Sequence, residues 1–265
     1  MKEVADAGQV PILMYHRLAS GDTSEGVQRR DPYLLAESAF EEQMQYLYRS
    51  GYSTMPLSDF VSYVNGKTVL PQKPVIITFD DGNRSDYVTA YPILRRFGFA
   101  ATFFVTVGSV GSPESLSVEQ IRDMSHSGMA TESHSLTHPY LTKLNREGIE
   151  RELGESKEIL ESKTGKAVHF LSIPNGTYND TVKRVAKELG YLAILTSDLG
   201  INNAKSDLYS LRRIAIKNGI SLPHFASLLK GQSMLRERCM QSLRDTVKIT
   251  LGIENYVLIR RRLLH

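Results

Sequence analysis

The sequence predicts an α/β barrel, in which parallel strands form a closed or nearly closed ring covered by helices. Short apolar segments alternate with segments of helical periodicity about seven times between residues 10 and 230. The apolar segments are nearly continuous, as expected for parallel strands that are buried on both faces. An open doubly wound sheet is the alternative architecture. In barrels of this kind, catalytic side chains lie at the C-terminal ends of the strands.

The expected strands share a short apolar run that ends at a polar or turn-forming residue. In chain order they are VPILMY (10–15), KPVIITF (73–79), FAATFFVTV (99–107), MATES (129–133), VHFLSI (168–173), YLAIL (191–195) and LRRIAI (211–216).

The expected helices have apolar residues three or four positions apart, and most of them stop at or near a glycine. They lie at 40–50, 87–97, 117–128, 145–163, 180–189 and 222–229. Ser117 and Gln120 form a capping-box signature at the start of the third of these helices.

Composition and charge narrow the class of protein. The 265 residues include 32 basic and 29 acidic side chains, and this nearly even balance argues against nucleic-acid binding. A single cysteine excludes an internal disulfide and a cysteine-based metal cluster. Neither a signal peptide nor a membrane-spanning run is visible. We therefore expect a protein that is cytoplasmic or peripheral at the inner membrane face, or periplasmic or extracellular if a leader was removed.

Two segments are expected, a barrel over residues 1–230 and a basic amphipathic extension over residues 231–265. The extension carries seven basic and three acidic residues, interleaved with apolar ones. It is either a solvated helix packed on the barrel or a docking surface for an anionic membrane or a biosynthetic partner.

Two adjacent carboxylates, Asp80 and Asp81, directly follow the expected strand at 73–79. They belong either to a simple turn, which the Asp-Gly sequence favours, or to a metal site. Adjacent negative charges raise one pKa unless a cation compensates. A metal bound by one carboxylate would remove this conflict and leave the other carboxylate free to act as a base.

Two histidines four residues apart, His134 and His138, lie in the sequence SHSLTHP after the expected strand at 129–133. Pro139 disfavours a regular helix there, so we expect a loop at the strand end. The spacing alone is a weak signal. Together with the aspartate pair it indicates a catalytic metal site, because one carboxylate and two imidazoles leave positions open for water and substrate.

Two further features lie at strand ends. Pro174 and Asn175 belong to a Pro-Asn-Gly sequence, which is either an ordinary turn or an oxyanion hole with a backbone donor. His16 ends the first apolar run, and it is either a hydrogen-bonded strand-end histidine or a catalytic residue. At the C-terminal end of the first strand, His16 would lie on the rim of the barrel where the aspartate pair and the histidine pair also gather, which favours a catalytic role.

The sequence resembles the polysaccharide deacetylases, carbohydrate esterase family 4 with its NodB-homology domain. The matching stretches are ILMYHRL, ITFDDGNRSDY, AYPILRRFGFAATFFV, SHSLTHPYL, ELGESKEILESKTGKAV, PNGTYND and LRRIAI, in family order. The resemblance implies a distorted (β/α)7 barrel and a divalent metal, often zinc. It also implies hydrolysis of an N-acetyl amide on an N-acetylated glycan, commonly a poly-N-acetylglucosamine-like chain.

The resemblance also implies a role for each motif residue. By position, the implied metal ligands are Asp81, His134 and His138. Asp80 resembles the general base, and the backbone N–H of Asn175, beside Pro174, resembles the donor that holds the oxyanion. His16 matches a branch of the family in which the first strand supplies the catalytic acid, and we prefer it to His224 of the late Leu-Pro-His sequence.

Two positions depart from the family pattern. Ser172 stands where many members have an arginine that orients the base. Either Arg212 or Arg213 could replace that arginine, and we expect Arg213 to contribute to the site. Glu132 stands where a glycine is often found, and its side chain either points outward or narrows the site.

The expected reaction is metal-dependent de-N-acetylation of a polysaccharide or oligosaccharide, which releases acetate during exopolysaccharide or cell-surface glycan biosynthesis. Two alternatives remain. One is a metal-dependent amidohydrolase of a small ureide or imide, and the other is a non-catalytic glycan-binding component of a polysaccharide assembly system.

Overall fold

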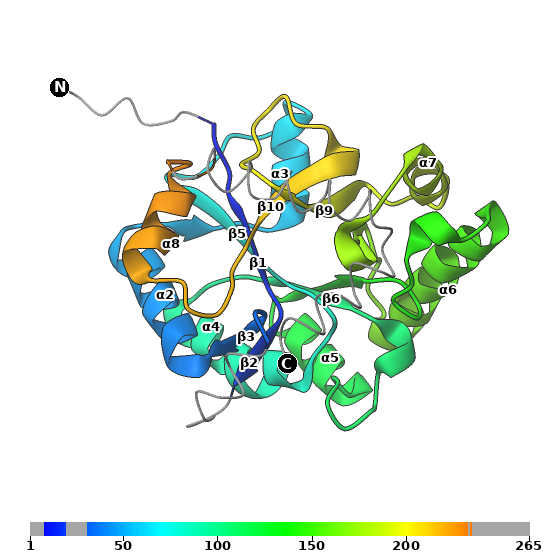
Figure 1. Ribbon diagram of the computed structural model, residues 1–265, viewed down its shortest axis with the longest axis horizontal. Helices are drawn as coiled ribbons and strands as arrows, with labels where there is room; N and C mark the ends of the chain where they lie inside the picture. The colour runs from blue at the N-terminus through cyan, green and yellow to red at the C-terminus, as the bar shows by residue number, and fades with distance from the viewer. Residues whose placement is uncertain (1–7, 20–30, 233, 235–265) are drawn as a thin grey trace, which may run out of the picture.

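The computed structural model describes residues 8–19, 31–232 and 234, and in this part of the chain parallel strands form a closed ring (Figure 1). The sheet has the order β1-β10-β9-β8-β7-β6-β5-β4, and a further pairing of β1 with β5 closes it into a seven-stranded barrel with β4 outside. The predicted barrel is confirmed. The ring strands are β1 (Ile12–Tyr15), β5 (Pro74–Phe79), β6 (Thr102–Val105), β7 (Ala130–Ser133), β8 (Phe170–Ser172), β9 (Ala193–Leu199) and β10 (Leu211–Ala215).

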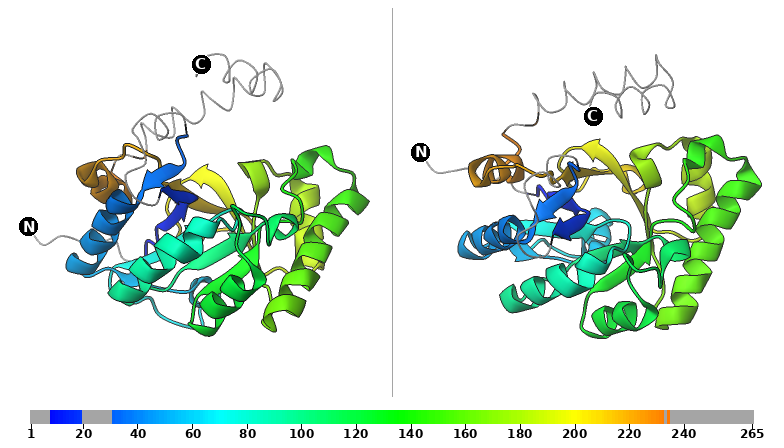
Figure 2. Two further views of the ribbon diagram at one scale, coloured as in Figure 1. Left: turned by 90° about the horizontal axis from the view of Figure 1, so that it is seen from below. Right: turned by 60° about the horizontal axis from the view of Figure 1, so that its bottom comes forward.

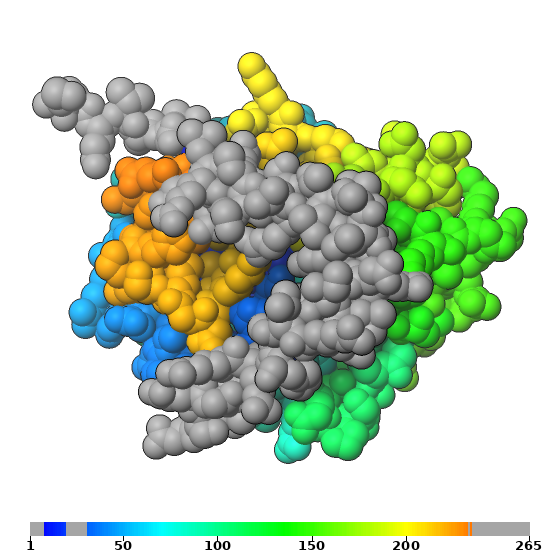
Figure 3. Space-filling model, in the orientation of Figure 1, coloured from blue at the N-terminus to red at the C-terminus, as the bar shows by residue number. Residues whose placement is uncertain are grey.

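Helices surround the ring of strands (Figure 2). They are α2 (Glu37–Arg49), α3 (Leu57–Val64), α4 (Tyr91–Phe97), α5 (Val118–His126), α6 (Arg146–Thr164), α7 (Asp180–Glu188) and α8 (Leu222–Leu229). The predicted capping box opens α5, because the side chains of Ser117 and Gln120 each accept a hydrogen bond from the other residue's backbone N–H. In the space-filling view, α2 and α8 form one side of the visible face, and α6 and α7 form the other (Figure 3). Within the described ranges, every helix is too short or too polar to cross a membrane.

Several short elements are absent from the sequence-based expectation. They are β2 (Arg17–Ala19), β3 (Leu34–Ala36), β4 (Ser53–Thr54) and α3, whereas the helix expected at 87–97 begins as the π-helix η1 (Asp86–Ala90) and continues as α4. β2 is separated from β1 by His16 alone, and β3 runs directly into α2, so neither stands out as an apolar run of its own. β2 and β3 pair with each other in a separate two-stranded parallel sheet, outside the barrel.

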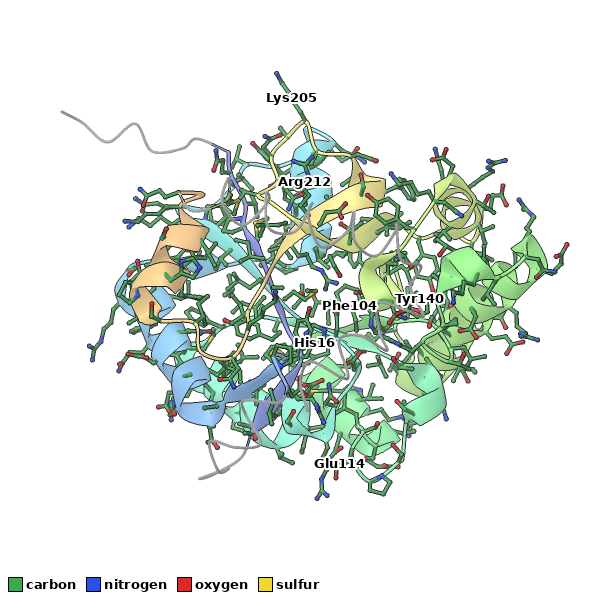
Figure 4. All side chains as sticks on the ribbon, in the orientation of Figure 1. His16, Phe104, Glu114, Tyr140, Lys205 and Arg212 are labelled. Carbon is green, nitrogen blue, oxygen red and sulfur yellow. The ribbon has the colours of Figure 1, made fainter. Side chains whose placement is uncertain are left out.

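The barrel interior contains a cluster of apolar side chains and, next to it, polar side chains that face the ends of the strands. One hydrophobic cluster contains Ile12, Ile76 and Phe104, from three different ring strands. The guanidinium carbon of the buried Arg213 lies 6.0 Å from the centroid of the Phe104 ring. The labelled side chains of Phe104 and His16 lie near the middle of the ring of strands, and Arg212 lies away from it (Figure 4). The apolar cluster therefore excludes water from the inner side of the polar residues that face the strand ends.

The pairing of β1 with β5 brings the end of the first strand to the aspartate pair. Tyr15 pairs with Phe79 in register, and the N–H of Asp80 donates a hydrogen bond of 3.0 Å to the carbonyl of Tyr15. His16 and Asp80 are thus the first residues to leave two adjacent strands. Residues 231–265 lie outside the described residues, apart from 231, 232 and 234, so the basic extension and its docking role stay predictions.

Candidate metal centre and active site

Three predicted metal ligands meet at the C-terminal ends of β5 and β7. Asp81, His134 and His138 each offer a ligand atom, and these atoms lie within 4.8 Å of one another. Asp81 Oδ1 lies 3.4 Å from His134 Nε2 and 3.5 Å from His138 Nε2. These separations are too long for good hydrogen bonds. They match the edge of about 3.4 Å that a tetrahedron with metal–ligand bonds of about 2.0–2.1 Å requires. The three residues therefore fit a divalent cation with open coordination positions.

Hydrogen bonding fixes the orientation of one of these ligands. The Nδ1 atom of His134 lies 2.8 Å from the carbonyl oxygen of Ser172 at the end of β8. Because a carbonyl can only accept, Nδ1 carries the proton, and the lone pair of Nε2 is available to bind a cation. This outer contact is typical of histidines that bind metals.

Local backbone strain is concentrated at the same place. Four of the five described non-glycine residues with positive φ lie here: Asp81 (81°), Ser135 (65°), His138 (61°) and Asn175 (59°). Such conformations cost about 1–3 kcal/mol each and persist only where surrounding contacts enforce them. One enforcing contact is the 3.0 Å hydrogen bond from the N–H of His138 to the hydroxyl of Ser135.

A buried glutamate of α6, Glu152, holds the loop that carries both histidines. Its Oε2 atom accepts hydrogen bonds from the N–H groups of Leu136 (3.1 Å) and Thr137 (2.8 Å), and its Oε1 accepts the Thr137 hydroxyl at 2.6 Å. Glu152 is 4% exposed, so no bulk water competes for these donors. The sequence could have indicated a role for Glu152, because it is a charged residue on the apolar helix face that includes Ile149 and Leu153.

We expect Glu152→Ala to weaken divalent-metal affinity by about 10- to 100-fold, because the loop bearing His134 and His138 loses three hydrogen bonds. Competition with a fluorescent chelator measures this affinity. Glu155→Ala, an exposed change on the same helix, is the matched control and should leave the affinity unaltered. Equal affinities in both variants would show that Glu152 does not support the ligands.

The predicted base, Asp80, is fully paired inside the barrel. Its two oxygens accept hydrogen bonds of 2.7 Å each from Nη1 and Nη2 of Arg213, and Oδ2 also accepts one of 3.0 Å from the hydroxyl of Ser172. Arg213 also donates to Ser172 Oγ at 2.8 Å and, through Nε, to the Thr196 carbonyl at 2.8 Å. Arg213 is 1% exposed whereas Arg212 is exposed, so Arg213 is the arginine that faces the base.

These contacts explain the departure at Ser172. A small hydroxyl at the end of β8 leaves room for a guanidinium that arrives from β10, and it bonds to both members of the ion pair. Burial raises the pKa of Asp80, but the charge and hydrogen bonds of Arg213 outweigh it and hold that pKa well below its usual range. Asp80 is therefore an anion throughout the neutral pH range.

His16, the predicted acid, directly follows β1 and lies next to Asp80 through the β1–β5 register. Its ring contacts Tyr33, with centroids 4.4 Å apart. Burial lowers the pKa of His16, while the carboxylates of Asp80 and Asp81 oppose this effect. His224, the alternative acid, lies in the first turn of α8, whose Phe225 packs against Tyr46 of α2. It is not at a strand end.

The predicted oxyanion segment follows β8 as the short helical turn η4 (Pro174–Gly176). The side-chain Nδ2 of Asn175 in this turn lies 3.5 Å from the carbonyl oxygen of His138, which links the turn to the loop that carries His134 and His138. A Cβ on Gly176 would lie 2.7 Å from Ser197 atoms, so the turn needs glycine there. The role of the Asn175 N–H stays a prediction.

Glu132 neither points into solvent nor narrows the site. It is 4% exposed, and its Oε2 accepts hydrogen bonds of 2.8 Å from the N–H groups of His169 and Phe170. β7 and β8 pair only at Ser133 and Leu171, so the glutamate supplies acceptors that the short ladder lacks. Burial raises the pKa of Glu132 to about 8.

We expect Glu132→Ala to lower the free energy of unfolding by about 1–3 kcal/mol, because the buried N–H of Phe170 and the part-buried N–H of His169 lose their acceptor. Glu132→Gln keeps an acceptor oxygen and should cost less. The folded wild type keeps a proton on Glu132 that the unfolded chain releases above about pH 4.3. Stability relative to Glu132→Gln should therefore fall as pH rises towards 8, and urea unfolding at pH 5 and pH 8 measures this. An unchanged difference between the two pH values would contradict the assignment.

Comparisons with known proteins agree with this geometry. The family model described as polysaccharide deacetylase matches residues 67–194. The structure of BA0330 from Bacillus anthracis, described as a polysaccharide deacetylase, is 30% identical, with a TM-score of 0.73 over 83% of this chain and 69% of that one. The chain belongs to the polysaccharide deacetylase family.

Two other relatives of this polysaccharide deacetylase are informative. The Streptococcus pyogenes deacetylase PplD, solved with acetate, is 28% identical with a TM-score of 0.79, over 83% of this chain and 98% of that one. The poly-beta-1,6-N-acetyl-D-glucosamine N-deacetylase of Staphylococcus aureus is 26% identical over 200 residues, which are 70% of this chain and 69% of the relative. Family members thus include enzymes named for removal of acetyl groups from a polysaccharide.

Proposed function

We propose that this chain is a metal-dependent enzyme that removes N-acetyl groups from a poly-N-acetylglucosamine-like glycan and releases acetate. The observation that carries the proposal is the juxtaposition of an anionic, arginine-paired Asp80 with an Asp-His-His triad of tetrahedral spacing. The neighbouring position of a base and an open metal site is what hydrolysis of an unactivated amide requires. The named activity of the Staphylococcus aureus relative supports the choice of glycan.

Zinc suits the donor set best. Two imidazole nitrogens and one carboxylate oxygen are common protein ligands of catalytic Zn²⁺, and three such ligands leave room for water and substrate. Asp81, His134 and His138 would hold the ion. When bound, a divalent cation supplies Lewis acidity, which polarises a carbonyl and makes water easier to deprotonate.

The protein side chains then divide the proton transfers. Asp80 accepts the proton of the attacking water, and Arg213 keeps both carboxylate oxygens oriented. The backbone N–H of Asn175 faces the oxyanion of the tetrahedral intermediate, a contact worth about 3 kcal/mol in other hydrolases. His16 donates a proton to the amide nitrogen as the C–N bond breaks, because an amine anion is too poor a leaving group to depart. The products are acetate and a free amino sugar.

Acetate release from β-1,6-linked N-acetylglucosamine oligomers tests the proposal. We expect release by the metal-loaded protein, loss after chelation and recovery when Zn²⁺ is restored. Turnover of ureides or imides without release from oligomers would indicate a small-molecule amidohydrolase. Glycan binding without acetate release would indicate a non-catalytic component and would overturn the proposal.

A further inference from the structure

His16 differs from the metal-binding histidine in how its ring is held. The Nδ1 atom of His134 is fixed by the Ser172 carbonyl. The Nδ1 atom of His16 is buried and has no hydrogen-bond partner among the described residues. A proton donor whose ring is free to turn transfers its proton poorly, because misplacement by about 1 Å can cost about 100-fold in rate. Something other than a hydrogen bond must therefore fix this imidazole.

The small sheet outside the barrel supplies that contact. β2 begins directly after His16, and β3 begins directly after Tyr33. The two strands pair in parallel with Arg17 opposite Leu34, so the register continued back by a residue places His16 opposite Tyr33. Neighbouring parallel strands lie about 4.8 Å apart. The observed distance of 4.4 Å between the ring centroids fits this register.

The backbone around Tyr33 is held from three sides. The Tyr33 N–H donates to Asp31 Oδ1 at 2.9 Å, and the same carboxylate forms an ion pair with Arg17, the neighbour of His16. The carbonyl of Pro32 accepts a hydrogen bond of 2.9 Å from the N–H of Asn218, which follows β10. Tyr33 is thus anchored both to the strand that follows His16 and to the barrel.

We propose that Tyr33 is a positioning residue for the general acid, and that its ring fixes the plane of the His16 imidazole toward the leaving nitrogen. This inference rests on the proposed function, in which His16 protonates the amine. The rings of Tyr33 and His16 are inclined by 39° to each other, and such a contact restrains the imidazole without adding charge.

The leaving group distinguishes this role from a general structural one. An amide nitrogen needs a proton in order to leave, whereas 4-nitrophenolate leaves without one. We expect Tyr33→Ala and Tyr33→Leu to lower kcat for acetate release from N-acetylglucosamine oligomers by about 10- to 100-fold, with KM nearly unchanged. Hydrolysis of 4-nitrophenyl acetate should change less than about twofold, and Tyr33→Phe should retain both activities because it keeps the ring.

A double-mutant cycle with His16→Ala makes the test specific. If Tyr33 acts through His16, then Tyr33→Ala should cause no further loss in the His16→Ala background. Equal losses on amide and ester, additive losses in the double variant, or an unchanged kcat in Tyr33→Ala would each overturn the inference. Failure of the wild type to release acetate from oligomers would instead overturn the proposed function.

Discussion

Asp80→Asn is expected to lower the rate of acetate release by about 10²- to 10⁴-fold, because an amide cannot accept the proton of the attacking water. The substitution preserves the shape of the side chain and the acceptor for Ser172 Oγ. It does not touch Asp81, His134 or His138, so metal binding should persist. Acetate release and metal content are measured on the same sample.

A control separates loss of the base from loss of the fold. Removing the negative charge leaves Arg213 without its partner, so some loss of stability is expected, and activity should be assayed well below the unfolding temperature. Asp59→Asn removes an exposed carboxylate of α3 and should leave activity and stability unaltered. Full activity of Asp80→Asn would exclude Asp80 as the base.

Arg213→Met is expected to destabilise the fold by about 3–5 kcal/mol, because it leaves the carboxylate of Asp80 buried without a cation. The side chain of Asp80 is 3% exposed, so bulk water cannot compensate for the lost cation. Without Arg213, burial should raise the pKa of Asp80 above its usual value. The variant should therefore lose both stability and the base.

The stability of Arg213→Met and that of the wild type should change with pH in opposite directions. In the wild type the pKa of Asp80 is depressed, so the pair stabilises the fold fully above about pH 3.9, the pKa in the unfolded chain, and this stabilisation is lost progressively as pH falls from there to the folded pKa. In Arg213→Met the folded carboxyl keeps a proton that the unfolded chain releases, so stability should fall as pH rises from 4 to 8. Chemical unfolding at several pH values measures the slope. Arg212→Met, an exposed change on the same strand, should behave as the wild type, and a similar slope in both variants would contradict the account.

Local chemistry made the ring strands and most helices predictable from sequence. The ring strands are buried on both faces, so each appears as a nearly continuous apolar run between turn residues. The capping box at Ser117 involves only Ser117 and Gln120, three positions apart, so the local sequence is enough to predict it. β2 and β3 could not be predicted in this way, because only His16 separates β2 from β1 and α2 begins directly after β3, so neither appears as a separate apolar run.

The candidate site was predictable only where motif spacing determines it. Asp81, His134 and His138 belong to short motifs at strand ends, and the structure brings them together. The choice between Arg212 and Arg213 depended on which side chain of a strand faces inward, and a bulge in the pairing of β10 with β9 between 211 and 213 obscures the alternation. The contact of Tyr33 with His16 depends on the register of β2 and β3, and this register cannot be predicted from the local sequence.

A titration of the chelated protein with Zn²⁺, with bound metal and acetate release from N-acetylglucosamine oligomers followed in the same samples, tests whether Asp81, His134 and His138 hold the catalytic metal. We expect no release without metal, a rate that rises in proportion to bound Zn²⁺ and saturation at a single ion per chain. Acetate release by the metal-free protein, or a rate that does not follow the bound ion, would contradict it.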